Sequence, residues 1–182
     1  MSASTADGDG VAPLADLAAR VGAALCERGQ TVAVAESSAG GLVSAALLAV
    51  PGASAFFLGG AVVYSRRAGK ALLGLTAADV TGMRGETEPF ARLIASRIRD
   101  THRATWGLGE TGAAGPSGSP YGDAPGHLCI AVAGAVTTSR TIETGNANRA
   151  LNMNLFARQL LSLFDEALRA QDSSQCAGAG RQ

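Results

Sequence analysis

The chain has 182 residues, of which 47% are hydrophobic and 16% charged, so it can bury a sizeable core and is too apolar for wholesale disorder. Fifteen basic and fifteen acidic residues cancel, which gives no electrostatic footprint of a nucleic-acid or membrane surface. No apolar run approaches the roughly 18 residues of a membrane helix and no signal-peptide pattern is present, so we expect a cytoplasmic protein.

Hydrophobic periodicity predicts alternating helices and strands along the chain. Helices are predicted at 13–28, 42–50, 66–74, 87–100 and 150–168, and strands at 31–35, 61–64, 104–109, 127–133 and 136–143. The last two strands should form a hairpin, so the pattern predicts an α/β fold, a three-layer α/β/α sandwich with a mixed, mostly parallel sheet. We expect one domain over residues 12–170, between flexible tails at 1–11 and 171–182.

The best-marked functional feature is the segment Glu36-Ser37-Ser38-Ala39-Gly40-Gly41, between a predicted buried strand and a helix. Open α/β sheets place their ligands at this edge. Amides at the helix start favour an anion or oxyanion, the glycines would let a ligand approach the backbone, and a serine could act as nucleophile. The alternative is that a serine only caps the helix, which is the commoner arrangement.

Two further segments follow predicted strands and could face the same crevice. In Tyr64-Ser65-Arg66-Arg67-Ala68-Gly69-Lys70, a lysine with a pKa lowered by burial could serve as the base for a serine, although a solvated helix start is commoner. The glycine-rich segment Glu110-Thr111-Gly112-Ala113-Ala114-Gly115-Pro116-Ser117-Gly118 could donate amides to a phosphate, or form a plain surface loop. His102 and His127 stand apart from each other and from any cysteine pair, so we expect no metal site.

These segments, in this order, resemble the C-terminal domain family of the competence-damage protein CinA, which includes stand-alone nicotinamide-nucleotide amidases. Residues 36–41 are similar to the family's Glu-Ser-Cys-Thr-Gly-Gly, and Val50-Pro51-Gly52-Ala53-Ser54 to its Val-Pro-Gly-Ser-Ser. Val63-Tyr64-Ser65 looks like its strand ending in Tyr-Ser, and Thr111-Gly112-Ala113-Ala114-Gly115-Pro116 like its Thr-Gly-Ile-Ala-Gly-Pro. The resemblance covers about residues 12–168, and three motifs in order are hard to explain by chance.

The resemblance implies hydrolysis of nicotinamide mononucleotide to nicotinate mononucleotide and ammonia, as in pyridine-nucleotide salvage, without a metal or other cofactor. By position, Ser37 would be the nucleophile of an acyl transfer, with Lys70 and Tyr64 completing the catalytic set. The family also implies a homo-oligomer, with a small nucleotide as the other partner. The residues that would bind the substrate are Glu36, Gly40, Gly41, Thr111, Gly112, Gly115 and Arg149, the last of which could pair with the phosphate.

The lysine position departs from the family pattern. Family members read Tyr-Ser-Asn-x-Ala-Lys, whereas this chain has Gly69 where the lysine stands and Lys70 one residue later. On a helix that shift turns the side chain by about 100°. Unless the local backbone adjusts, the general base is missing and the rate would fall by a factor of roughly 10²–10⁴.

Other departures indicate a divergent branch. Ser38 and Ala39 replace the usual Cys and Thr, while Glu110 and Tyr121-Gly122-Asp123 are not typical of the amidases. Three functions therefore remain open: an amidohydrolase of nicotinamide mononucleotide, a nucleotide-binding protein that has lost catalysis, and a serine hydrolase of another small amide. The variant Ser37→Ala should lose turnover in the first and third cases and retain ligand binding in the second.

Overall fold

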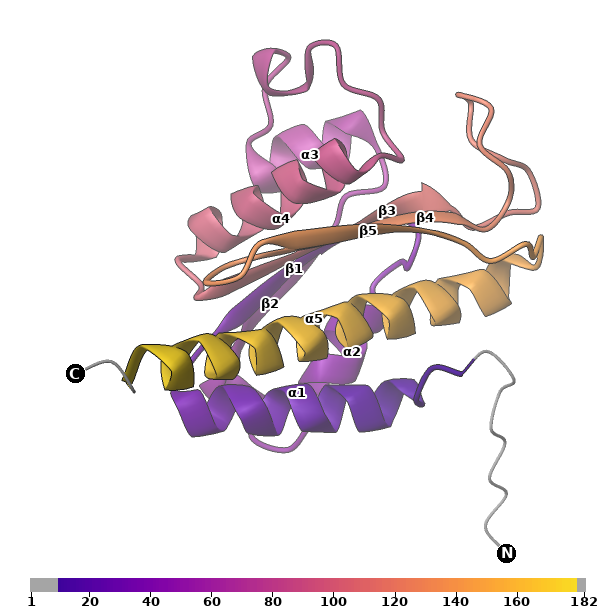
Figure 1. Ribbon diagram of the computed structural model, residues 1–182. Coiled ribbons are helices and arrows are strands. Elements are labelled where there is room, and N and C mark those ends of the chain that lie inside the picture. Colours follow the sequence, from indigo (N-terminus) through magenta and orange to yellow (C-terminus); the bar gives the residue numbers. More distant parts are fainter. Residues whose placement is uncertain (1–9, 180–182) are drawn as a thin grey trace, which may run out of the picture.

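The computed structural model describes residues 10–179, which are arranged in three layers (Figure 1). The middle layer is a sheet with the strand order β2-β1-β3-β4-β5. Its strands are β1 (Val32–Glu36), β2 (Phe57–Val62), β3 (Trp106–Ala113), β4 (His127–Ala133) and β5 (Thr138–Glu143). Strands β2, β1 and β3 are parallel, and β4 and β5 are added antiparallel, so the predicted mixed sheet is confirmed.

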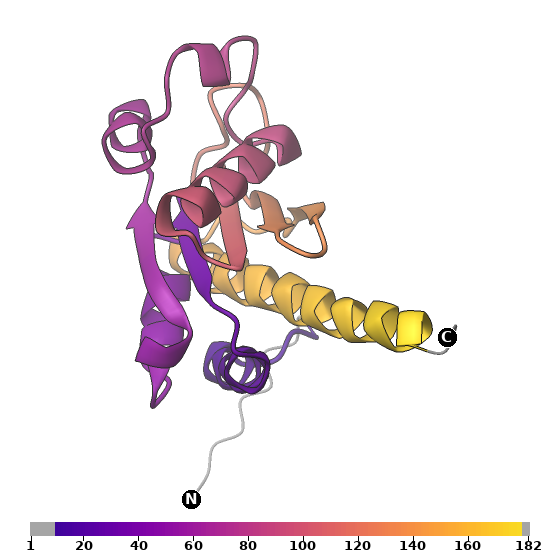
Figure 2. The ribbon, with the colours of Figure 1, turned by 90° about the vertical axis from the view of Figure 1, so that its left-hand side faces the viewer.

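Helices cover both faces of the sheet, as Figures 1 and 2 show. They are α1 (Leu14–Arg28), α2 (Leu42–Leu48), α3 (Arg66–Leu73), α4 (Glu88–His102) and α5 (Arg149–Ala179), with short 3₁₀ turns η1 (Ala53–Ala55) and η2 (Ala78–Val80). The larger core lies beneath α1, α2 and α5, where Trp106 meets Phe164 edge-on at 5.5 Å between ring centroids. The opposite face is covered by α3 and α4, which confirms the α/β/α sandwich.

Small residues let α4 lie unusually close to the centre of the sheet. A Cβ atom at Gly107 would lie 2.0 Å from the carbonyl oxygen of Ala95, and one at Gly109 would lie 2.2 Å from that of Ala91. Real Cβ atoms do not approach a carbonyl oxygen so closely, so β3 needs glycine at both positions. This close contact fixes β3, and with it the residues at the carboxyl end of that strand.

The clearest boundary differences from the prediction are in β2, β3 and α5. Strand β2 spans Phe57–Val62, whereas that strand was predicted at 61–64. Strand β3 continues past residue 109 because Thr111 and Gly112 pair with Cys129 and Leu128 of β4, so these residues belong to the sheet instead of a loop. Pairing with a distant strand has no local signal in the sequence.

Helix α5 runs to Ala179, so residues 171–179 continue the last helix, which was predicted to end at residue 168. No Pro or Gly interrupts residues 169–177, the side chain of Gln171 is buried, and Arg28 of α1 donates to Asp172 at 3.1 Å. The other parts of the two predicted tails, residues 1–9 and 180–182, lie outside the described residues.

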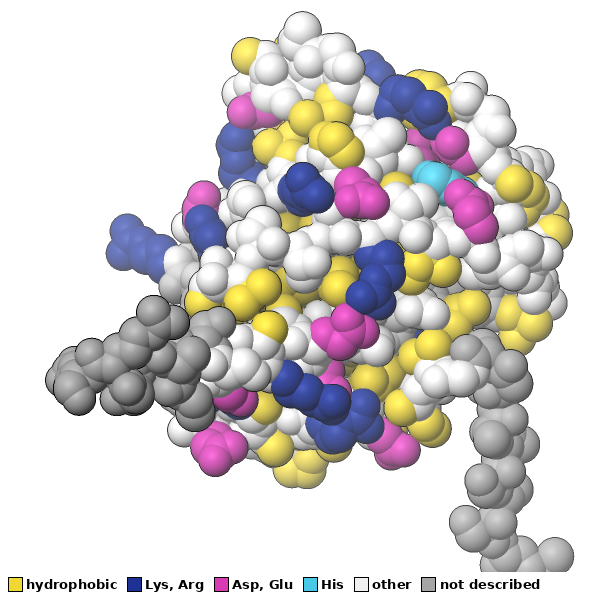
Figure 3. Space-filling model, in the orientation of Figure 1, with side chains coloured by type: hydrophobic (Ala, Val, Ile, Leu, Met, Phe, Trp, Pro, Cys, Tyr) yellow, Lys and Arg dark blue, Asp and Glu magenta, His cyan; other side chains and the backbone are white. Residues whose placement is uncertain are grey.

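Positive and negative side chains are interspersed over the face that Figure 3 shows. One of the ion pairs, between Arg140 of β5 and Glu166 of α5 at 2.7 Å, joins the edge strand to the long helix. Within residues 10–179, no helix combines the length and the apolar character needed to cross a membrane.

Candidate functional site

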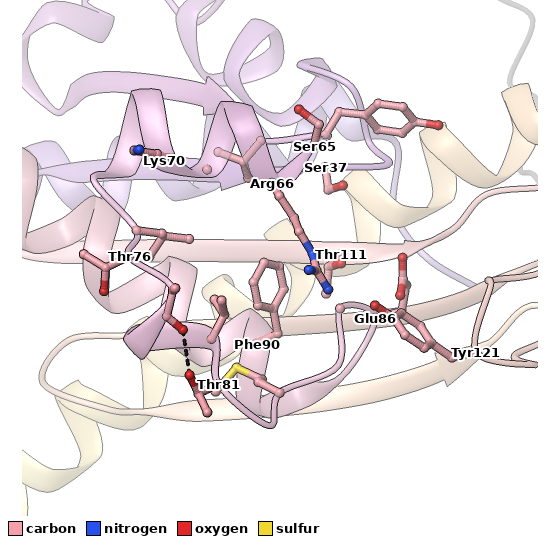
Figure 4. Close-up of a pocket in the computed structure, with 18 of the residues that line it drawn as sticks. Ser37, Ser65, Arg66, Lys70, Thr76, Thr81, Glu86, Phe90, Thr111 and Tyr121 are labelled. Carbon is pink, nitrogen blue, oxygen red and sulfur yellow. Dashed lines mark hydrogen bonds between the residues drawn. The ribbon is translucent and has the colours of Figure 1, made fainter.

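A cavity of about 610 Å³ opens beside the carboxyl ends of β1, β2 and β3 (Figure 4). It is lined by Ser37, Val63, Tyr64, Ser65, Arg66, Gly69, Lys70, Leu75, Thr76, Ala77, Val80, Thr81, Gly82, Met83, Gly85, Glu86, Phe90, Thr111, Pro120 and Tyr121. The structure thus brings residues of all three sequence segments to one space. Carboxyl ends of parallel strands are where open α/β sheets bind their ligands.

The turn that carries Ser37 is held by a buried carboxylate from the neighbouring strand. One oxygen of Glu110 accepts hydrogen bonds from the backbone amides of Ser37 at 2.8 Å and Ala39 at 2.9 Å, and the other accepts from the hydroxyl of Ser38. Glu110 and Ser38, which both depart from the family pattern, therefore form one hydrogen-bonded unit. The unit fixes the backbone of Ser37 while leaving its side chain at the cavity.

A second buried glutamate organises the start of α2. Glu36 accepts from the amides of Val43 at 3.1 Å and Ser44 at 2.9 Å, and from the hydroxyl of Ser44 at 2.6 Å. Its side chain is fully buried and does not line the cavity. The amides of Val43 and Ser44 are consequently not available to a ligand, and we assign Glu36 a structural role in place of the predicted substrate contact.

Burial raises the pKa of Glu110 to about 7, and the nearby carboxylate of Glu36 contributes to the rise. The hydrogen bonds from Ser38, Ala39 and Ser37 act in the opposite direction without offsetting the desolvation. The amides of Ser37 and Ala39 can only donate, whereas the hydroxyl of Ser38 can donate or accept, so the turn can hold the carboxyl group in either protonation state. The geometry of the Ser37 turn is therefore linked to a group that titrates near neutral pH.

Of the predicted substrate-binding residues, only Thr111 lines this cavity. The glycines at 40, 41, 112 and 115 allow backbone conformations or close contacts that a larger residue would not. Gly115, for example, has a φ of 106°, and a Cβ atom there would lie 2.5 Å from the carbonyl oxygen of Ala147. Arg149 donates to the carbonyl of Gly115 at 2.9 Å and to the hydroxyl of Tyr64 at 3.4 Å, with its guanidinium 5.9 Å from the centroid of the Tyr64 ring. Arg149 thus contacts Tyr64, which lines the cavity, and does not line the cavity itself.

The three predicted catalytic residues share the cavity without contacting one another. The hydroxyl of Ser37 has no hydrogen-bond partner among residues 10–179. Lys70 is exposed and its amine points away from Ser37 (Figure 4), as the one-residue shift on the helix predicts. Gly69 is buried at the wall of the cavity, where a Cβ atom would lie 3.2 Å from the side chain of Leu75.

The segment 74–87, between α3 and α4, forms the wall that the sequence analysis did not identify. Arg84 in this segment pairs with Asp123 at 2.5 Å and lies over the ring of Tyr121, 4.9 Å from its centroid. These contacts join the segment to the loop at 114–126. The atypical Tyr121-Gly122-Asp123 therefore shapes the cavity, whereas residues 74–87 carry no motif that could have been recognised beforehand.

His127 secures the same wall from the sheet. Its Nε2 lies 3.0 Å from the carbonyl oxygen of Glu86, and its Nδ1 contacts the carboxylate of Glu143. Since both partners are acceptors, the imidazolium form satisfies both nitrogens. Burial lowers the pKa of His127, but the hydrogen bonds to Glu143 and Glu86 and the charges of Glu143 and Asp123 outweigh it, so the pKa is raised.

These observations define a class of protein: a three-layer α/β/α domain with a ligand-sized cavity at the carboxyl edge of its parallel strands. The sequence pattern of the CinA C-terminal domain family matches residues 14–168. The chain therefore belongs to the CinA C-terminal domain family.

Relatives with this domain include longer proteins. A CinA-like protein of Anaeromyxobacter sp. (strain Fw109-5) is 39% identical over 158 residues, which are 85% of this chain and 38% of that protein. A CinA-like protein of Synechococcus sp. (strain CC9902) is 43% identical over 118 residues, which are 65% of this chain and 28% of that protein. The chain thus spans well under half the length of these relatives.

Solved structures show the same fold over almost their whole length. The competence damage-inducible protein A (ComA) from Klebsiella pneumoniae subsp. pneumoniae MGH 78578 superposes with a TM-score of 0.81 at 26% identity, covering 87% of this chain and 98% of that one. The competence/damage inducible protein CihA from Agrobacterium tumefaciens gives 0.78 at 26% identity, covering 86% and 95%.

Proposed function

We propose that the protein binds a pyridine mononucleotide in the cavity beside Ser37 and hydrolyses its carboxamide to the acid and ammonia, with Ser37 as nucleophile. The observation that carries this proposal is the convergence of Ser37, Tyr64, Lys70 and Thr111 on one cavity of about 610 Å³. That volume lies within the usual range for sites of small-molecule ligands. Apolar side chains such as Phe90 could pack against the pyridine ring.

The reaction would proceed in two steps. The oxygen of Ser37 attacks the carboxamide carbon, the C–N bond breaks, and the leaving nitrogen takes up a proton and departs as ammonia. Water then attacks the resulting ester, which releases the carboxylic acid and restores the serine hydroxyl. Lys70 is the side chain of the family pattern that would take the serine proton, and it must turn toward Ser37 in the presence of substrate to do so.

The second candidate function is nucleotide binding without turnover. It is favoured by Gly69 at the family's lysine position and by the direction of Lys70, which leaves the hydroxyl of Ser37 without a hydrogen-bonded base in the described part of the chain. Catalytic hydrogen bonds often form only in the substrate complex, so the ligand-free geometry is compatible with both functions.

Ammonia release from nicotinamide mononucleotide tests the proposal, with Ser37→Ala as the variant and the exposed Ser54→Ala as the matched control. We expect turnover in the wild type and the control, and none in Ser37→Ala. A thermal shift with the same nucleotide is measured in parallel. Stabilisation by the nucleotide without any ammonia supports the binding function, and neither signal would rule out this ligand.

A further inference from the structure

The cavity contains an arginine that the family pattern does not have. Arg66 begins α3 at the position of the family's asparagine, and its side chain extends from the Ser37 side of the cavity toward Thr111 (Figure 4). Among the described arginines, only Arg66, Arg67 and Arg103 have a side chain without a hydrogen-bond or ion-pair partner, and of these only Arg66 lines the cavity. A positive charge without a partner thus faces the space where a ligand would bind.

An unpartnered acceptor lines the same cavity. The Oε2 atom of Glu86 is buried and has no hydrogen-bond partner among the described residues. A buried carboxylate oxygen that accepts no hydrogen bond destabilises the structure, because burial has removed its hydrogen bonds to water and no protein donor replaces them. The backbone of Glu86 is held by His127 at 3.0 Å, so the side chain cannot easily leave. A hydroxyl or amide N–H of a ligand would satisfy this oxygen.

The other cations near the cavity are less suited to hold an anion. Arg149 already donates to Gly115 and Tyr64 and does not line the cavity. The amine of Lys70 lies at the far end of the cavity from Glu86 and Tyr121 in Figure 4. A guanidinium presents two parallel donors to a phosphate, which an ammonium does not.

We infer that Arg66 binds the phosphate of the ligand, in place of the predicted Arg149, and that Glu86 accepts a hydrogen bond from a hydroxyl or amide donor of the same molecule. The ligand class is a small phosphorylated compound with a donor group, such as a mononucleotide. The inference rests on the proposed function for the identity of the nucleotide, but the assignment of Arg66 to the anion can be tested without it.

The test is a comparison of three probes: nicotinamide mononucleotide, nicotinamide riboside, which lacks the phosphate, and inorganic phosphate. Binding is measured by calorimetry and by thermal shift in the wild type, Arg66→Ala, Arg66→Lys and the matched control Arg67→Ala. A charge-assisted pair contributes enough to change a dissociation constant by about 10-fold to 100-fold. We expect the wild type and Arg67→Ala to prefer the mononucleotide over the riboside by that factor.

In Arg66→Ala this preference, and the stabilisation by inorganic phosphate, should disappear, while Arg66→Lys should keep part of both. Glu86→Gln should weaken the mononucleotide and the riboside alike and leave inorganic phosphate unchanged. Phosphate-dependent binding that persists in Arg66→Ala, or is absent from the wild type, would overturn the inference. If phosphate binding depends on Arg66 but neither pyridine compound binds, the inference stands and the proposed function fails.

Discussion

Replacing Glu110 by glutamine should flatten the dependence of folding stability on pH. The pKa of Glu110 is about 7 in the folded protein, against 4.5 for an unperturbed glutamate. Because the folded state holds the proton more tightly, the stabilisation is complete below pH 4.5 and is lost as pH rises through 7. A tenfold difference in proton affinity corresponds to about 1.4 kcal/mol, so the wild type should lose on the order of 3 kcal/mol over this window.

Glutamine can preserve the contacts of the carboxylate while removing the charge. Its amide oxygen can accept from the amides of Ser37 and Ala39, and its NH₂ group can donate to Ser38 once that hydroxyl rotates. Glu110→Ala, in contrast, leaves three donors without an acceptor, at about 1–3 kcal/mol for each buried group. The alanine variant should therefore be less stable than the glutamine variant at every pH.

The assay is urea unfolding followed by circular dichroism at pH 5, 6, 7 and 8, and the quantity compared is the difference in free energy of unfolding between wild type and Glu110→Gln. Other titrating groups, His127 among them, are common to both proteins and cancel in this difference. We expect the glutamine variant to become the more stable of the two as pH rises. Parallel curves across the whole range would refute the conclusion that Glu110 is desolvated as the structure indicates.

Three further predictions concern the wall, the sheet and the base. The protonated form of His127 stabilises the folded state, fully below about pH 6.5 and less as pH rises through its raised pKa. His127→Gln should remove this stabilisation, so the free energy of unfolding in urea should differ more from that of the wild type at pH 6 than at pH 9. Gly109→Ala should lower the free energy of unfolding by at least about 1–3 kcal/mol, because the new Cβ would lie 2.2 Å from the oxygen of Ala91; a neutral effect in denaturant unfolding would contradict this contact. Gly69→Lys should raise ammonia release from nicotinamide mononucleotide by roughly 10²-fold if a missing base limits turnover, while an unchanged rate in a folded variant that binds the nucleotide would show that something else does.

Local signals in the sequence were enough to predict the elements and the order in which they occur. The helix predicted at 87–100 is α4 (Glu88–His102), and the strand predicted at 31–35 is β1 (Val32–Glu36). Both predictions rest on the spacing of apolar residues and on short runs of β-branched residues. These signals come from residues that are close together in the sequence. The motif residues Ser37 and Thr111 were also recognisable, since each belongs to a segment that follows a predicted strand, at the edge where this fold class binds its ligands.

The roles of the polar side chains near that edge became visible only in the folded chain. Glu36 and Glu110 accept hydrogen bonds from backbone amides that the sequence left available to a ligand. Arg149 donates to a backbone carbonyl and to Tyr64, whereas the side chain of Arg66 lines the cavity without a partner among the described residues. Local periodicity fixes which residues share an element, but the partner of a side chain depends on strand order, register and the path of distant loops. Those long-range contacts place Glu110 beside Ser37, 73 residues away along the chain.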